Sequence, residues 1–182
     1  MSERTAAEKA VGRLVTDVAD FPERGVIFKD ITPLLADPDG FAAVVAALAE
    51  AGRDADGAVA VDKVVGMESR GFILGAPVAL ALGVGFVPVR KAGKLPRATH
   101  AVSYDLEYAS AALEIHRDAV APGERVLVVD DVLATGGTLA ATRQLIECCA
   151  GTVHAAAMLM ELTFLPGREA VGDLPFTVLM TV

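Results

Sequence analysis

Positive charge is scarce in this chain of 182 residues. Sixteen lysines and arginines stand against 24 acidic residues, which gives a formal net charge of −8 at pH 7 with neutral histidines. A protein that binds mainly nucleic acid needs a broad basic face to neutralise the phosphates. The composition therefore argues against nucleic acid as the main partner.

Cysteine is equally scarce. Cys148 and Cys149 are the two cysteines of the chain, and neighbours in sequence rarely pair with each other. Neither cysteine forms a zinc-ligand spacing with a histidine, so the sequence predicts no structural metal. Unpaired cysteines are typical of a reducing compartment, and we expect a cytoplasmic protein.

The usual nucleotide-binding signatures are also missing. The chain has no GxxxxGK[ST] segment, which excludes a P-loop, and its one GxG, at 83–85, leads into an apolar strand instead of a helix. No lysine follows Lys94. A phospho-acceptor receiver domain needs a later lysine, so that class is excluded as well.

The longest stretch without charge, residues 71–89, has the length of a membrane span. It contains four glycines and two prolines, and residues 83–85 divide it. We therefore expect a buried helix followed by a buried strand. The first 14 residues carry charges throughout, so we expect no signal peptide. No membrane association is predicted.

Apolar runs and helical periodicities alternate along the chain. Such alternation predicts an α/β protein with βαβ units around a parallel sheet, in one domain without linker or repeat. Asp37 and Pro38 form a helix start, and Gly151 a helix end. The expected helices are 5–18, 38–51, a helix after 66–72, and 138–149; the expected strands are 61–65, 85–89, two within 99–116, 126–129, 153–160 and 176–182.

The segment VLVVDDVLATGGT, residues 126–138, carries the clearest chemistry. Its apolar start predicts a strand buried on both faces, so Asp130 and Asp131 should lie at the carboxyl end of that strand, where open α/β sheets bind ligands. The glycine-threonine turn and the following helix start offer backbone N–H groups to an anion. An acidic turn without a ligand is the plain alternative, and the buried strand with its acid pair argues against it.

Two further stretches point to a small anionic ligand. Between residues 89 and 99 lie Arg90, Lys91, Lys94 and Arg97 with no acid among them, which favours an anion. Residues 26–28 are apolar within an irregular segment, and an apolar loop of this kind usually covers something.

The segment VVDDVLATGGT resembles the phosphoribosyl pyrophosphate (PRPP) motif of the type I phosphoribosyltransferases. The resemblance implies that Asp130 and Asp131 hold the ribose hydroxyls of PRPP. It further implies a loop around the 5′-phosphate, made by Ala134, Thr135, Gly136, Gly137 and Thr138.

Nearly the whole chain resembles the adenine phosphoribosyltransferase family, through five segments in the family's order: FPERGVIFKDITPLL, VVGMESRGFILGAPVA, VPVRKAGKLP, SYDLEY and VVDDVLATGGT. The implied fold is the type I phosphoribosyltransferase fold, a central mostly parallel sheet flanked by helices. Residues 1–182 would form one domain, with a small hood of about residues 1–35 packing on the core.

The resemblance also implies a base slot and a leaving-group site. Backbone at Ile27 and Lys29 would bind the adenine edge, with Phe28 stacked on one face of the ring and Leu162 closing the other. Many members carry arginine in place of Lys29. Arg70, Lys91 and Lys94 would hold the pyrophosphate together with Mg²⁺, which substrate oxygens would hold near Asp130 and Asp131 without a protein cage.

In the family a mobile loop, here about residues 98–109, closes over the site. Glu107 would manage the proton of the base, and Tyr108 would lie near the leaving group; a solvent-facing role for Glu107 stays open. The implied activity is transfer of the phosphoribosyl group to N9 of adenine, giving AMP and pyrophosphate, by a homodimer. Two alternatives are a transferase for hypoxanthine, guanine or xanthine, and a non-catalytic PRPP-sensing regulator.

Overall fold

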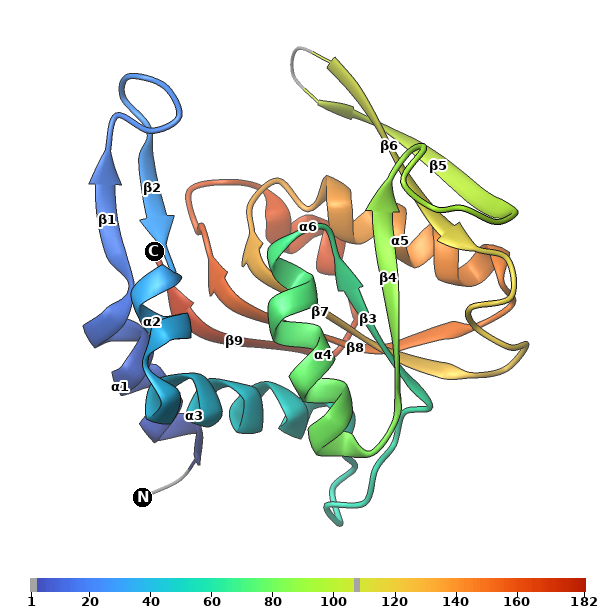
Figure 1. Cartoon of the computed structure of the whole chain (residues 1–182), viewed down its shortest axis with the longest axis horizontal. Helices are drawn as coiled ribbons and strands as arrows, with labels where there is room; N and C mark the ends of the chain where they lie inside the picture. Colours follow the sequence, from blue (N-terminus) through green and yellow to red (C-terminus); the bar gives the residue numbers. More distant parts are fainter. Residues whose placement is uncertain (1–2, 107–108) are drawn as a thin grey trace.

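A seven-stranded sheet forms the centre of the molecule (Figure 1). The computed structural model describes residues 3–106 and 109–182. The strand order is β5-β6-β4-β3-β7-β8-β9, and neighbours among the last five strands of this order run parallel. These five are β4 (Gly85–Lys91), β3 (Lys63–Met67), β7 (Arg125–Leu133), β8 (Thr152–Glu161) and β9 (Phe176–Thr181). The expected α/β fold with a mostly parallel sheet is confirmed.

Strand β7 lies between β3 and β8 and is buried on both faces. Leu127 and Val129 pack into the hydrophobic cluster under the first three long helices, α1 (Glu3–Leu14), α3 (Pro38–Ala49) and α4 (Arg70–Leu82). Val126 and Val128 face the opposite cluster. The strand is longer than the predicted 126–129 and ends at Leu133. Asp130 and Asp131 therefore lie within its carboxyl-terminal half instead of following it.

The second face of the sheet is covered by α5 (Gly137–Cys148) and the short α6 (Gly167–Val171). Helix α5 follows β7 directly, as expected. Its predicted range, 138–149, agrees with the structure to within one residue at each end. The predicted C-cap at Gly151 is wrong, because the C-cap is Cys149 and the left-handed turn residue is Ala150, with φ 60°.

The amino-terminal region differs from the expectation. Helix α1 ends at Leu14, and residues expected to continue it form β1 (Thr16–Ala19), which pairs antiparallel with β2 (Ile27–Asp30). The expected irregular segment is therefore partly a hairpin, followed by α2 (Thr32–Ala36). The β1 side chains are all exposed, so the strand lacks the apolar alternation by which a strand is recognised.

The charge-free stretch forms α4 and β4, as expected. Helix α4 buries Leu74 and Val78 against the sheet, while Ile73 and Leu80 on its other side are exposed. Within the described ranges, no helix combines the length and apolarity that crossing a membrane requires.

A second hairpin, β5 (Thr99–Leu106) and β6 (Ala109–His116), projects from the sheet (Figure 1). Strand β6 joins β4 through Arg90 opposite Glu114 and Lys91 opposite Leu113. The hairpin is thus attached at the end of β4, where Arg90 and Lys91 lie.

Candidate active site

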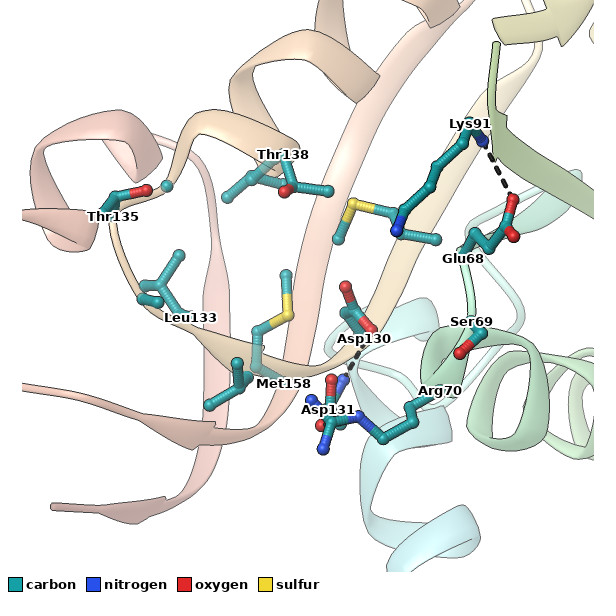
Figure 2. Close-up of a pocket in the computed structure, with 15 residues that line it drawn as sticks. Glu68, Ser69, Arg70, Lys91, Asp130, Asp131, Leu133, Thr135, Thr138 and Met158 are labelled. Carbon is teal, nitrogen blue, oxygen red and sulfur yellow. Dashed lines mark hydrogen bonds and ion pairs between the residues drawn. The ribbon is translucent and has the colours of Figure 1, made fainter. Parts of the chain in front are cut away.

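A polar cavity of about 310 Å³ opens where β3, β4 and β7 end (Figure 2). It contains side chains from the first turn of α4 and from a segment much later in the chain, where the end of β7 leads into the start of α5. Its lining comprises Met67, Glu68, Ser69, Arg70, Lys91, Asp130, Asp131, Val132, Leu133, Ala134, Thr135, Gly136, Thr138, Leu139 and Met158.

The two aspartates of β7 are the most buried charges of this cavity. Asp130 is 9% and Asp131 4% exposed, and the Asp131 amide donates a 2.9 Å hydrogen bond to Asp130 Oδ1. Burial, and then the charge of Asp131, raises the pKa of Asp130 well above its ordinary value. A ligand that donates hydroxyl groups to Asp130 would relieve this unfavourable burial.

Arg70 neutralises the second aspartate. Its Nε lies 2.8 Å from Asp131 Oδ2, an ion pair between the start of α4 and the end of β7. The close approach depends on Gly71, because a Cβ there would lie 2.8 Å from the Val129 carbonyl oxygen and 2.9 Å from Asp130 Oδ1. A glycine at position 71 therefore positions the arginine.

The glycine-threonine loop closes another side of the cavity. Ala134, Thr135, Gly136 and Thr138 line it, whereas Gly137 is the first residue of α5 and is not among the lining residues. Gly136 has φ 83°, a conformation that favours glycine. This turn leaves the first N–H groups of α5 without helical partners, so they are available to an anion.

Of the predicted cations, the structure brings Arg70 and Lys91 to the cavity. Lys91 extends from the end of β4 into it (Figure 2). Lys94 does not line the cavity; it is exposed, and its carbonyl oxygen accepts a 3.1 Å hydrogen bond from Arg90 Nη1.

Glu68 is a lining residue that the sequence did not single out. Its Oε2 accepts a 2.9 Å hydrogen bond from the Lys91 amide and lies 3.4 Å from Arg90 Nε. The Lys91 amide, followed by the charge of Arg90, lowers the pKa of Glu68. The carboxylate thereby ties the loop before α4 to the end of β4. The only signal in the sequence was the glycine-containing segment 66–72 before the expected helix.

A smaller apolar slot, of about 140 Å³, adjoins the polar cavity. The four residues predicted for the base all line it, together with Arg70 and Asp131, which line both spaces. The slot is lined by Val26, Ile27, Phe28, Lys29, Arg70, Asp131, Val132, Met160 and Leu162.

Aromatic and charged contacts fix the hairpin side of this slot. The Arg70 guanidinium lies 5.0 Å from the centre of the Phe28 ring, and Phe21 meets Phe28 edge-on at 5.0 Å. Lys29 Nζ forms a 2.7 Å ion pair with Asp17 on the paired strand β1. The ammonium of Lys29 is thus held by the hairpin itself.

Two predicted residues, Glu107 and Tyr108, lie outside the described residues. The neighbouring Tyr104 is described: its hydroxyl is 3.4 Å from Thr138 Oγ1, and a Cβ on Gly137 would meet its ring at 3.0 Å. The β5–β6 hairpin therefore contacts the glycine-threonine loop.

The donor set limits what metal the cavity can hold. Among the residues that the structure describes, no three His, Cys, Asp or Glu side chains form a metal-binding group. The carboxylates of Asp130 and Asp131 are oxygen donors of the kind that hydrated Mg²⁺ accepts, although Arg70 already neutralises one of them. These residues fit a magnesium ion held mostly by a ligand's oxygens and by water.

Comparison with known proteins identifies the family. The model of the phosphoribosyl transferase domain matches residues 32–162. An adenine phosphoribosyltransferase from Nocardioides sp. is 71% identical over 93% of this chain and 91% of its own length. The chain belongs to the adenine phosphoribosyltransferase family. A Streptomyces coelicolor member is 55% identical over the full length of both chains.

Solved structures of the family agree with the fold. The enzyme from Thermoanaerobacter pseudethanolicus matches with a TM-score of 0.89 at 45% identity, over 96% of this chain and 99% of that one. The Saccharomyces cerevisiae enzyme, solved with an imino-altritol bisphosphate and adenine, matches with a TM-score of 0.90 at 38% identity, over 96% and 99%.

Proposed function

We propose that this protein transfers the 5-phosphoribosyl group of PRPP to N9 of adenine, releasing AMP and pyrophosphate for purine salvage. The observation that carries the proposal is the shared wall: Arg70 and Asp131 line both the polar cavity and the apolar slot. A sugar phosphate in the first space and a flat base in the second would meet there. Relatives named adenine phosphoribosyltransferase, up to 71% identical, support this assignment.

On the donor side, Asp130 and Asp131 accept hydrogen bonds from the ribose hydroxyls. Thr135, Thr138 and the loop amides bind the 5′-phosphate, with Ala134, Gly136 and Gly137 allowing close backbone approach. The pyrophosphate lies against Arg70 and Lys91, and Lys94 can join only if its exposed side chain turns inward. The proposed roles agree with the charges: acids face hydroxyls, and cations face phosphates.

On the acceptor side, the adenine ring enters between Phe28 and Leu162. Backbone groups of Ile27 and Lys29 form hydrogen bonds with the edge of the ring. The Lys29 side chain is not needed for these bonds, and it is already paired with Asp17. A base in this slot stacks on an aromatic ring, an interaction worth about 1–3 kcal/mol.

Bond breakage between C1′ and the pyrophosphate oxygen leaves positive charge on the ribose, and N9 then forms the new bond while its proton is lost. The nearby carboxylates stabilise the positive sugar, and Arg70 and Lys91 stabilise the negative leaving group. Bound Mg²⁺ supplies further neutralisation of the pyrophosphate. Positioning of the two substrates supplies the remainder.

The direct test incubates purified protein with PRPP, Mg²⁺ and one purine base at a time. We expect AMP from adenine and at least about 100-fold less product from hypoxanthine, guanine or xanthine, because their exocyclic groups mismatch the backbone edge. Product from guanine or hypoxanthine at the adenine rate would change the assigned base. No product from any base would leave a PRPP-binding regulator as the better assignment.

Glu107 is proposed to hold the proton of the base, and Tyr108 to contact the leaving group. Replacing Glu107 by Gln should lower kcat by about 100-fold while the affinity for PRPP stays nearly unchanged, as for loss of a general base. An unchanged kcat would remove Glu107 from the mechanism.

The physiological form is proposed to be a cytoplasmic homodimer in which residues 1–182 act as one domain with the hood of residues 1–35. The free thiols of Cys148 and Cys149 support a reducing compartment. Exposed Ile73 and Leu80 on α4 offer apolar surface for a second subunit. Sedimentation equilibrium would test the dimer, and a single monomeric species at micromolar concentration would contradict it.

A further inference from the structure

Helix α6 lies directly behind the loop that is proposed to bind the 5′-phosphate. A Cβ placed on Gly167, the first residue of α6, would overlap with the carbonyl oxygen of Ala134 and lie 2.9 Å from Leu133 Cγ. A Cβ on Gly136 would overlap with Ala170 Cβ and lie 3.0 Å from the Gly167 carbonyl oxygen. The loop and α6 therefore touch backbone to backbone, with a glycine on each side.

Helix α6 is itself fixed by an ion pair to the central sheet. Arg168 Nε donates a 2.8 Å hydrogen bond to Oε1 of Glu161, and Arg168 Nη2 donates to Glu161 Oε2. Glu161 ends β8 and is 5% exposed. A planar guanidinium that donates to both oxygens of a buried carboxylate is restricted to one orientation, because both hydrogen bonds require the two groups to stay aligned.

Two further contacts hold the helix. The Arg168 guanidinium lies 4.5 Å from the centre of the Phe176 ring on β9, and Val171 is 1% exposed in the cluster that also contains α5 residues. Helix α6 is thus attached to β8, β9 and α5. Such attachment is what a short helix needs in order to resist displacement, since five residues have little helical stability of their own.

We propose that Gly167 and the Arg168–Glu161 ion pair are positioning residues for PRPP: they hold the Ala134–Thr138 loop so that its N–H groups face the 5′-phosphate. None of the three touches the reacting atoms. The inference rests on the proposed function, because it assigns the loop to the donor phosphate. It predicts that changing Gly167 or Arg168 impairs the donor and spares the base, because no residue of α6 lines the slot. Glu161 itself is left unchanged, since its neighbours Met160 and Leu162 do line the slot.

The first experiment uses Gly167→Ala. The added methyl group must push the Ala134 carbonyl and the loop away from α6, and misplacement of about 1 Å in a binding site can cost about 100-fold. We expect KM for PRPP to rise by about 10-fold or more, while KM for adenine changes by less than about 2-fold. Calorimetric titration of the free protein with PRPP should show the same weakening without adenine.

Gly12→Ala is the matched control. It adds the same methyl group to a glycine of α1 that has nothing within 4 Å of a built Cβ. Its kinetic constants should equal those of the wild type. Thermal unfolding of both variants separates loss of the fold from displacement of the loop.

Arg168→Lys gives a second, milder test if Gly167→Ala does not fold. Lysine keeps the charge beside Glu161 but cannot grip both carboxylate oxygens, so we expect a rise of about 3-fold in KM for PRPP alone. Arg143→Ala is its control, because it breaks an exposed Arg143–Glu147 ion pair on α5 that does not touch the loop.

The outcomes are separable. Wild-type protein that turns over adenine, with Gly167→Ala and Arg168→Lys raising KM for PRPP selectively, supports the inference. Active wild type with both variants unchanged, or with both KM values raised equally, overturns it while leaving the function intact. Wild type that binds neither PRPP nor ribose 5-phosphate overturns the function and the inference together.

Discussion

The polar cavity and the apolar slot share Arg70 and Asp131 but are built in different ways. The aspartates of the cavity lie on β7, a strand with parallel neighbours on both sides, and are almost fully buried. The slot is bounded by the β1–β2 hairpin, where Ile27 is 60% exposed. In the proposed function, donor binding in the cavity relies on charges that the sheet holds in place, and binding of the base in the slot relies on the fit of a surface hairpin around a flat ring.

The difference between the cavity and the slot is tested most directly at Asp131, which lines both. Asp131→Asn keeps the shape of the side chain but removes the charge that pairs with Arg70 and that is proposed to accept a hydrogen bond from a ribose hydroxyl. We expect kcat/KM for PRPP to fall by about 100-fold or more, as when one preorganised partner of a transition state is lost. Steady-state kinetics with PRPP varied at saturating adenine would measure this.

Asp118→Asn is the control for that variant, since Asp118 is an exposed carboxylate paired with Arg97. It should leave the kinetics unchanged. An effect of Asp131→Asn smaller than about 3-fold would remove Asp131 from the donor site.

Phe28→Ala addresses the slot alone. Loss of the stacked ring should raise KM for adenine by about 5-fold to 150-fold, from about 1–3 kcal/mol of stacking, with KM for PRPP nearly constant. Phe164→Ala, at a ring that is 73% exposed and does not line the slot, provides the control. Equal changes in both KM values would mean that the two spaces do not bind separate substrates.

The two lysines predicted for the pyrophosphate differ in position: Lys91 lines the cavity and Lys94 does not. Lys91→Met should raise KM for PRPP by about 10-fold, the loss of one charge-assisted hydrogen bond of about 1.5 kcal/mol. Lys94→Met should change it by less than about 2-fold, because the side chain lies outside the cavity. If the two effects are reversed, Lys94 moves into the site when PRPP binds.

The smallest expected effect concerns stability. Since burial and the charge of Asp131 raise the pKa of Asp130, the folded protein holds that proton more tightly than the unfolded chain. The free energy of unfolding therefore falls as the pH rises from the ordinary aspartate value of 3.8 through the raised folded-state pKa.

Asp130→Asn abolishes this loss of stability. Its Tm should exceed that of the wild type at pH 7, and the gap should shrink as the pH falls toward 3.8, while PRPP binding weakens. Scanning calorimetry at several pH values measures the gap, with exposed Asp56→Asn as reference. A lower Tm than wild type at pH 7 would show that the Asp130 charge stabilises the fold.

Sequence alone predicted one wall of the cavity, because the chemistry of that wall is contiguous. The buried strand, the acid pair and the glycine turn follow one another from Val126 to Thr138, and each has a local signature. Helix α4 followed by β4, and the parallel sheet, were predicted from the charge-free stretch and from the alternation of apolar runs with helical periodicities. The resemblance added the substrates and the residues for them outside this segment. All four residues implied for adenine line the slot, and of the three cations implied for the pyrophosphate, Arg70 and Lys91 line the cavity.

The elements that sequence missed have no local pattern. Strand β1 is exposed throughout, and α6 has five residues without a side-chain cap, so neither shows a periodicity. Glu68 takes its partner from Lys91, 23 residues later, and Gly167 matters through contact with Ala134. Such contacts form only when the chain has folded, so they cannot be predicted from local patterns in the sequence.

The central position of β7 in the sheet also predicts which parts of the molecule unfold locally. Amide hydrogens of β7, bonded to strands on both sides, should exchange with solvent only when the whole sheet unfolds. Amides of the outer strand β5, which pairs with β6 and joins the sheet through the end of β4, can exchange by local opening. We therefore expect strands β5 and β6 to open and close many times while Asp130 and Asp131 keep their positions.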